Sequence, residues 1–377
     1  MLSELVENEP GLNEKACATI LYCLSTSCMA EEAYEFLTNM GKRGYFPDAA
    51  TLNVVMSCLI KGSDLKATCE LMDDFVARGG KPAFNVYILL ITALCKEGKG
   101  NEIDLYVNQM SLNGHLCNVF SYNMLIDCLT KVGMMEKASQ VFREMVQRSV
   151  TPNLVTFNTL ISGFCKNKEV SKSQELLKML LEHGFRPDVI TFSSIIDGLC
   201  RVHQMEDALN CFHEMIEWGV SPNNVSYNIL IRSFCAIGEI PKAMKLFSRM
   251  IASGINPDVF TFNSFILSFC KMIKVDSART FFNSMLKFGA TPDSYTYNAF
   301  IKVLCDSNRI DEAKEIMLMM EANNCPPNAH SYSSIIQALE SKGCSEEAQK
   351  LVKESEKKGI FVTVVPKIEI DSELTES

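Results

Sequence analysis

Residues 154–188 read LVTFNTLISGFCKNKEVSKSQELLKMLLEHGFRPD, and variants of this stretch recur along the chain. The cysteine marks the period, because Cys165, Cys200, Cys235, Cys270 and Cys305 lie 35 residues apart and Cys95 lies two periods before Cys165. A disulfide framework or a metal site has no reason to keep such a spacing, whereas a chain of stacked units does. The cysteines are therefore interpreted as a small core side chain that recurs at one place of the unit.

The same frame divides residues 14–363 into ten repeats without insertion or deletion. The repeats are 14–48, 49–83, 84–118, 119–153, 154–188, 189–223, 224–258, 259–293, 294–328 and 329–363. Each reads as two antiparallel helices, since apolar residues such as Phe157, Leu160 and Ile161 follow helical spacing. We expect the Ser or Thr in the third place of most repeats, for example Thr156, to be the N-cap of the first helix.

The second helix of each repeat carries features that suit close packing and a defined end. A small residue and then a methionine recur at fixed places, as in Ala138 and Met145. A glycine such as Gly184 follows the helix, where the chain must turn left-handed. One hairpin cannot bury its apolar face alone, so neighbours must stack. The predicted fold is all-α, a right-handed α-solenoid superhelix of about ten helix-turn-helix repeats.

The two ends of the chain fall outside the ten repeats. Residues 1–13 are acidic and lack arginine, unlike an organellar transit peptide. Leu5 falls where methionine usually lies in the frame, and Asn13 where aspartate usually lies. We interpret this segment as the end of an upstream repeat or an N-terminal cap, and expect a targeting peptide further upstream. Residues 364–377 are interpreted as an acidic C-terminal tail.

The composition argues against an enzyme, a cofactor or a membrane protein. No stretch offers the roughly 20 apolar residues that a membrane span needs. The sequence has no Cys-x-x-Cys, no phosphate-binding glycine loop and no nucleophile motif, and its 5 histidines occupy unrelated places in the repeats. We therefore expect no catalytic residues, no metal and no cofactor, and the in-register thiols suggest a reducing compartment.

The net charge of −9 is unusual for a nucleic-acid binder, which normally needs cations to neutralise phosphates. The distribution of charge matters more, however, because one place in the repeat is repeatedly basic. The thirteenth place holds a cation in six of ten repeats, here named the cation row: Lys61, Lys96, Lys131, Lys166, Arg201 and Lys271. Such a row predicts a positive ladder along one face, although cations that stabilise a helix C-terminus would give the same pattern.

The period, the Tyr/Phe-Asn pair near the start and the Gly-x-x-Pro-Asp at the end resemble the pentatricopeptide repeat family of plant organellar RNA-binding proteins. The resemblance covers about nine-tenths of the chain. The tetratricopeptide repeat differs, since its period is 34 and its Trp-x-x-Leu-Gly pattern is absent here. In the family, lysines like those of the cation row approach RNA phosphates, so the resemblance implies the same role for these residues.

The resemblance also implies which residues read the RNA. In this family the fifth and last residues of a repeat hydrogen-bond one base, and the second packs against neighbouring bases. The implied base-reading pairs are Asn123 with Asn153, Asn158 with Asp188, Ser193 with Asn223, Asn228 with Asp258, Asn263 with Asp293, and Asn298 with Asn328. The implied base-packing residues, here named the packing row, are Phe120, Val155, Ile190, Val225, Phe260 and Tyr295.

By the family's correspondences these six pairs predict a core target of 5′-YUAUUY-3′, where Y is C or U, with the N-terminal repeat at the 5′ end. The remaining repeats depart from the pattern. They pair Ala18 with Asp48, Asn53 with Ala83, Ile88 with Asn118, and Ser333 with Thr363. Ala and Ile cannot hydrogen-bond a base edge, and an Asp or Asn before a helix can also be a simple cap.

The leading hypothesis is a monomer that binds single-stranded organellar RNA selectively and acts by occupancy in RNA processing, stability, splicing or translation. We expect it in a mitochondrion, with the chloroplast as the alternative. A second hypothesis is a protein-interaction scaffold in an organellar ribosome or respiratory complex, since solenoids also bind proteins. An RNA-editing factor is a weaker third option, because no editing domain follows the repeats.

Overall fold

The computed structural model describes residues 14–42, 48–62, 64–116 and 118–362. Over these ranges the chain forms twenty α-helices of 13 residues each and no β-strand. The chain divides into two compact parts, an N-terminal part of residues 1–198 and a C-terminal part of residues 199–377. The interpretations of residues 1–13, of residues 364–377 and of Thr363 lie outside the described residues.

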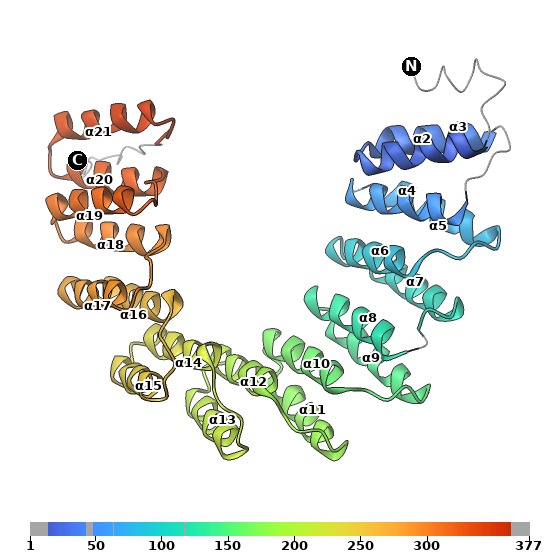
Figure 1. The fold of residues 1–377 in the computed structure, drawn as a ribbon, viewed down its shortest axis with the longest axis horizontal. Coiled ribbons are helices and arrows are strands. Elements are labelled where there is room, and N and C mark those ends of the chain that lie inside the picture. Colours follow the sequence, from blue (N-terminus) through green and yellow to red (C-terminus); the bar gives the residue numbers. More distant parts are fainter. Residues whose placement is uncertain (1–13, 43–47, 63, 117, 363–377) are drawn as a thin grey trace, which may run out of the picture. The chain divides into compact units, whose positions relative to one another are not determined.

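The helices follow the repeat frame, since the first helix of each repeat begins at its first residue (Figure 1). The N-terminal part contains α2 (Glu14–Thr26), α3 (Ala30–Lys42), α4 (Ala49–Lys61), α5 (Leu65–Ala77), α6 (Phe84–Lys96), α7 (Gly100–Leu112), α8 (Val119–Lys131), α9 (Met135–Gln147), α10 (Leu154–Lys166) and α11 (Val170–Glu182). Helix α12 (Val189–Arg201) contains the boundary. The C-terminal part continues with α13 (Met205–Glu217), α14 (Asn224–Ala236), α15 (Ile240–Ala252), α16 (Val259–Lys271), α17 (Val275–Lys287), α18 (Ser294–Asp306), α19 (Ile310–Ala322), α20 (Ala329–Ser341) and α21 (Ser345–Lys357).

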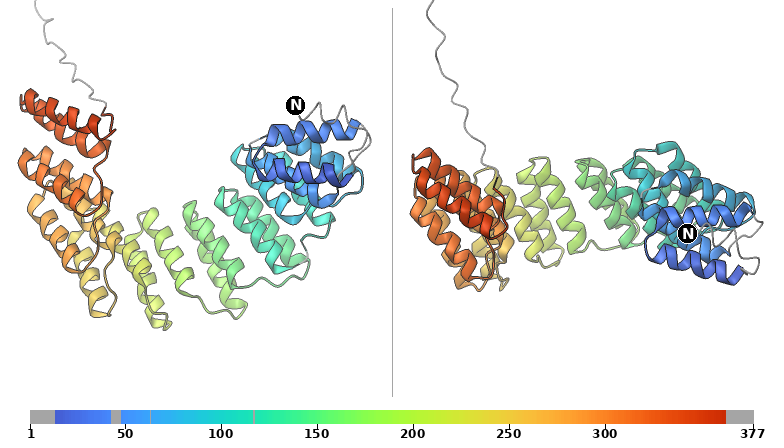
Figure 2. Two further views of the ribbon diagram at one scale, coloured as in Figure 1. Left: turned by 45° about the horizontal axis from the view of Figure 1, so that its top comes forward. Right: turned by 90° about the horizontal axis from the view of Figure 1, so that it is seen from above.

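Within each part the first helices of neighbouring repeats pack against one another and form one layer, as α8 does with α10 and α16 with α18. The second helices lie beside them, so that successive hairpins stand side by side (Figure 2). This confirms the predicted all-α repeat solenoid. At 13 residues, none of the described helices is long enough or apolar enough to cross a membrane.

The core repeats with the sequence. The fourth place of the first helix is a fully buried aromatic ring from the third repeat to the tenth, for example Tyr122 and Phe157. The expected small residue and methionine of the second helix, such as Ala138 and Met145, are 0% exposed. Several of these rings contact a phenylalanine on the second helix of the preceding repeat, as Phe157 does with Phe142. Burial of an aromatic side chain contributes several times the free energy of one methylene group.

The expected N-cap was wrong by three residues. The cap is the last residue of the preceding repeat, whose side chain accepts a hydrogen bond from the backbone N–H of the third-place residue, as Asn153 does from Thr156. Thr156 is N3, and its hydroxyl bonds back to the N-cap backbone to complete a capping box. Asparagine and aspartate rank above threonine as N-cap residues.

The chain turns left-handed after the second helix, as predicted. Gly184 has a φ of 78° there, and where the repeat has no glycine, Ser149 and Asn324 adopt φ values of 60° and 56°. Glycine adopts such angles without steric cost, whereas other L-residues are strained.

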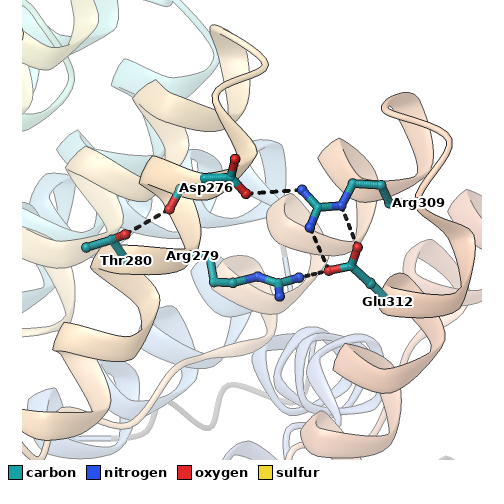
Figure 3. A network of polar contacts seen from close by, with 5 residues as sticks. All are labelled: Asp276, Arg279, Thr280, Arg309 and Glu312. Atoms are coloured by element: carbon teal, nitrogen blue, oxygen red, sulfur yellow. Dashed lines mark hydrogen bonds and ion pairs between the residues drawn. The ribbon is translucent and has the colours of Figure 1, made fainter.

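Ion pairs connect the second helices of neighbouring repeats. Arg309, the N-cap residue of α19, contacts Asp276 of α17 at 3.3 Å and Glu312 of α19 at 2.5 Å (Figure 3). Arg279 of α17 also contacts Glu312. The two arginines and the two acids thus form one network of ion pairs between α17 and the start of α19. Similar pairs join Lys137 to Asp104, Lys172 to Glu136, Lys242 to Glu206 and Lys314 to Glu347. Exposed pairs each contribute ~0–1 kcal/mol, so they serve chiefly to fix register.

Four of the six in-register cysteines are buried core residues, as expected, and two are not. Cys165, Cys200, Cys235 and Cys305 are buried, whereas Cys95 and Cys270 are half-buried. Burial raises the pKa of the Cys235, Cys270 and Cys305 thiols to about 12.

These raised pKa values predict slow alkylation, because the thiolate is the reactive form. In folded protein at pH 8 iodoacetamide is expected to modify the exposed Cys23 and Cys28 well before Cys235, Cys270 or Cys305. Peptide mass spectrometry along a time course measures the order, and urea-unfolded protein is the control in which all thiols react alike. Equal rates for Cys28 and Cys235 in the folded chain would contradict the packing described here.

Candidate nucleic-acid interface

The packing row consists of large apolar side chains that the fold leaves in solvent. Phe120, Val155, Ile190, Val225, Phe260 and Tyr295 are between 55% and 73% exposed, although most large apolar side chains of the first helices are buried. The same place holds Lys15, Ala50, Asn85 and His330 in the other repeats. Exposed apolar groups that recur at one register position indicate a binding surface rather than chance.

Beside this row the structure brings five of the six implied base-reading pairs into contact. The fifth-place amide Nδ2 donates to the Oδ1 of the last residue, over distances of 3.1 Å for Asn123 with Asn153, 3.1 Å for Asn158 with Asp188, 3.0 Å for Asn228 with Asp258, 3.5 Å for Asn263 with Asp293 and 3.3 Å for Asn298 with Asn328. Ser193 belongs to the N-terminal part and Asn223 to the C-terminal part, where Asn223 caps α14.

The third-place hydroxyl of the next repeat completes each of these five sites. In the seventh repeat, Thr261 Oγ1 donates to Asn228 Oδ1 at 2.6 Å and lies 2.9 Å from Asp258 Oδ1. A hydroxyl has one proton, and the shorter distance assigns it to Asn228. The equivalent donors are Thr156, Thr191, Thr296 and Ser331, at 2.5 to 2.6 Å from the asparagine oxygen. Sequence reasoning missed this role, because the same residues were interpreted only as caps.

The capping bond decides which atom each pair presents to solvent. Asp258 Oδ1 accepts from the Thr261 backbone N–H at 2.9 Å, whereas Oδ2 accepts from Asn228 Nδ2 at 3.1 Å and keeps a lone pair for a further donor. Asn153 Oδ1 accepts from the Thr156 backbone N–H at 3.0 Å, so its Nδ2 remains as an outward donor. Repeats that end in Asp therefore offer an acceptor, and repeats that end in Asn offer a donor.

In the C-terminal part these elements line one groove of about 680 Å³ between α14, α16 and α18. Two polar pairs and three members of the packing row contribute to it: Asn228, Asp258, Asn263, Asp293, Val225, Phe260 and Tyr295. Lys271 of the cation row and Arg232, which sequence reasoning did not single out, also line this groove. The groove thus combines apolar side chains, hydrogen-bonding groups and cations, as a surface for single-stranded nucleic acid requires.

All six members of the cation row lie at the C-terminal end of a first helix and are exposed. Lys131 donates to Asp127 at 2.6 Å, and this bond raises the pKa of the lysine above its ordinary value. Within the described residues Lys61, Lys96, Lys166 and Lys271 form no ion pair. Their charges are therefore available to a ligand, in contrast to several second-helix cations, which pair with acids of the neighbouring repeat.

The remaining repeats lack this arrangement. Asn53 Oδ1 accepts from the backbone N–H of Ala83 at 2.8 Å, so it caps rather than joins a polar pair. Asp48 and Asn118 cap α4 and α8, while Ala18 and Ile88 present no hydrogen-bonding group. Ser333 lies in α20, and its implied partner Thr363 is not among the described residues.

We predict that Thr261→Val destabilises its site. Valine keeps the shape of threonine but leaves the Asn228 oxygen without its donor, and Thr261 is 0% exposed. Asn228 is half-buried, and the loss of a hydrogen bond there costs ~0.5–1.5 kcal/mol. Urea unfolding and amide exchange of α14 and α16 measure the loss, which Thr261→Ser should avoid. Thr280→Val removes an exposed hydroxyl that bonds a carbonyl of its own helix and is the matched control. Equal stability of the two valine variants would refute the role of the hydroxyl.

Comparison with known proteins agrees with this architecture. A family model described as PPR repeat family matches residues 117–166, 152–201, 187–236, 224–271, 257–306 and 292–341, and a PPR repeat model matches 86–115 and 330–360. A mitochondrial pentatricopeptide repeat-containing protein of Arabidopsis thaliana is 45% identical over 65 residues, which are 17% of this chain and 10% of that protein.

The fold is similar to that of solved members. The crystal structure of PPR10 from maize has a TM-score of 0.51 and 20% identity, over 96% of this chain and 61% of that chain. PPR10 in complex with an 18-nt psaJ RNA element also has a TM-score of 0.51, with 23% identity over 94% of this chain and 56% of that one. This chain thus spans less than two thirds of either structure. Because the first family model alone covers more than half of its residues, the chain belongs to the pentatricopeptide repeat family.

Proposed function

We propose that the chain binds single-stranded RNA selectively, with one base at each of the six repeats from residue 119 to residue 328. The observation that carries the proposal is the coincidence of two features in the same repeats. Only there does an exposed apolar second-place side chain accompany a hydrogen-bonding residue at both the fifth and the last place. The shared fold with RNA-bound PPR10 supports the proposal.

The outward atoms explain how U and C would be distinguished. Uracil presents an N3–H donor, which the outward Oδ2 of Asp188, Asp258 or Asp293 can accept. Cytosine presents N3 as an acceptor, which suits the outward Nδ2 of Asn153 or Asn328. The packing row would hold five of the six bases between two apolar side chains and the last between Tyr295 and His330. Stacking on an aromatic side chain such as Phe260 contributes ~1–3 kcal/mol per base. This supports 5′-YUAUUY-3′ as the core target, with adenine opposite Ser193 and Asn223 by the family's correspondence.

The chain would act by occupying a transcript rather than by catalysis. The repeat motif accounts for nearly all of the described residues, and none of them form a cluster of potential metal ligands. Bound RNA would be shielded from nucleases, or held open for splicing or translation. The relative named as mitochondrial supports a mitochondrial setting, with the chloroplast as the alternative.

Binding of the purified chain to a labelled RNA that contains CUAUUC tests the proposal. An RNA of the same composition in shuffled order is the control, and both are measured at two salt concentrations. Submicromolar, salt-sensitive binding that depends on the order of bases is the expected result. Absence of binding to either RNA at low salt would favour the protein-interaction scaffold, for which the degenerate first three repeats offer surface.

A further inference from the structure

The cation row is interrupted twice among the six base-reading repeats. The thirteenth place is Ala236 in the seventh repeat and Asp306 in the ninth. In both of these repeats the ninth place is basic, with Arg232 in α14 and Lys302 in α18. In the other eight repeats the ninth place holds no cation: the residues are Tyr22, Ser57, Thr92, Asp127, Ser162, Asp197, Leu267 and Gln337.

The ninth and thirteenth places lie on the same face of a helix. Residues four apart are neighbours on the helix surface, one turn or about 6 Å apart along the axis. Arg232 is exposed and lines the same groove as Asn228, Asp258 and Lys271. It therefore stands between the base-reading residue of its repeat and the place where the missing cation would have been.

We propose that Arg232 takes over the phosphate-contacting role of the seventh repeat, and Lys302 that of the ninth. This inference rests on the proposed RNA binding. Every base-reading repeat then offers one cation to the RNA backbone: Lys131, Lys166, Arg201, Arg232, Lys271 and Lys302.

The chemistry of the two side chains suits this role to different degrees. The guanidinium group of arginine can bind a phosphate through two parallel hydrogen bonds, and its length offsets a shift of one turn. Lys302 forms no ion pair within the described part of the chain, but Asp306 follows it by one turn and lowers the local positive charge. The effect of Arg232 is therefore expected to exceed that of Lys302.

The salt dependence of binding separates a phosphate contact from other roles. Each contact to a single strand contributes ~0.7 to the slope of log affinity against log salt. Arg232→Gln is expected to lower the slope by about 0.7 and to weaken binding about five-fold at 0.1 M salt, equally for CUAUUC and shuffled RNA. Arg232→Gln combined with Ala236→Lys moves the charge to the thirteenth place and should restore both values.

Two variants calibrate the measurement. Lys271→Gln removes a member of the cation row and should lower the slope by a similar amount. Lys245→Gln removes an exposed charge from α15, a second helix, and should leave the slope unchanged.

Three outcomes would overturn the inference. If Arg232→Gln behaves like Lys245→Gln while Lys271→Gln lowers the slope, RNA binding stands but Arg232 does not contact phosphate. If Arg232→Gln weakens binding without a change of slope, the arginine stacks on or reads a base instead. If the unaltered chain binds neither RNA, the proposed function itself fails.

Discussion

Replacing four lysines of the cation row by glutamine is expected to weaken binding to single-stranded RNA by several hundred-fold at 0.1 M salt. The four are Lys61, Lys96, Lys166 and Lys271. These four lysines are exposed and form no ion pair within the described residues. Four phosphate contacts would contribute about 3 to the slope of log affinity against log salt, which corresponds to about three decades of affinity between 1 M and 0.1 M salt. Because Lys61 and Lys96 belong to repeats before the base-reading ones, the RNA must extend several nucleotides 5′ of CUAUUC.

A matched control variant removes four positive charges from second helices instead of first helices. Lys178, Lys245, Lys287 and Lys350 lie on second helices, are exposed, and form no ion pair within the described ranges. Their joint replacement by glutamine should change affinity far less, because these charges lie on second helices, whereas the cation row lies on first helices. Equal losses in the two variants would mean that net charge, rather than a ladder, governs binding.

The stability of the first variant needs a separate check. A cation near a helix C-terminus stabilises the helix by ~0.3–1 kcal/mol, so part of any loss of binding could come from frayed helices. Circular dichroism across a thermal scan measures this contribution. We expect the four replacements to keep the helical signal at the temperature of the binding assay, since the rings and methionines of the core are unchanged.

The repeat period, the helix pairs and the recurrent core were predictable from sequence because each depends on local patterns. Aromatic, alanine and methionine residues at fixed places determine burial, and the structure places Tyr122, Ala138 and Met145 accordingly. The cap was misplaced because serine, threonine, asparagine and aspartate are all good caps, and the pattern alone does not say which of two neighbouring candidates begins the helix.

The hydroxyl that orients each of these fifth-place asparagines could not be found by such reasoning. Thr261 and Asn228 are 33 residues apart and meet only when two hairpins stack. The groove lined by Arg232 could not be predicted for the same reason, because its lining residues come from three successive repeats. The ion pair of Lys131 with Asp127, by contrast, could have been predicted, since residues four apart on a helix are neighbours.

Asp258→Asn is expected to reverse the base preference of the seventh repeat from U to C. The wild-type aspartate presents an outward acceptor, whereas asparagine, held by the same capping bond from Thr261, presents an outward donor. Asparagine caps a helix as well as aspartate does, so the fold should be unaffected. Base discrimination by such contacts is typically ~1–3 kcal/mol, and 1.4 kcal/mol corresponds to about ten-fold in affinity.

Affinities for CUAUUC and CUACUC, which differ only at the fourth base, measure the switch. The wild-type chain should favour the first RNA by roughly ten-fold and the variant should favour the second by a similar factor. Asp207→Asn makes the same change of charge on the exposed second helix α13, so it should raise both affinities slightly and leave their ratio alone. A uniform gain in the Asp258 variant, without reversal, would show that the residue acts through its charge and as a cap but does not read the base. Reversal at this position alone would instead assign the fourth base to the seventh repeat.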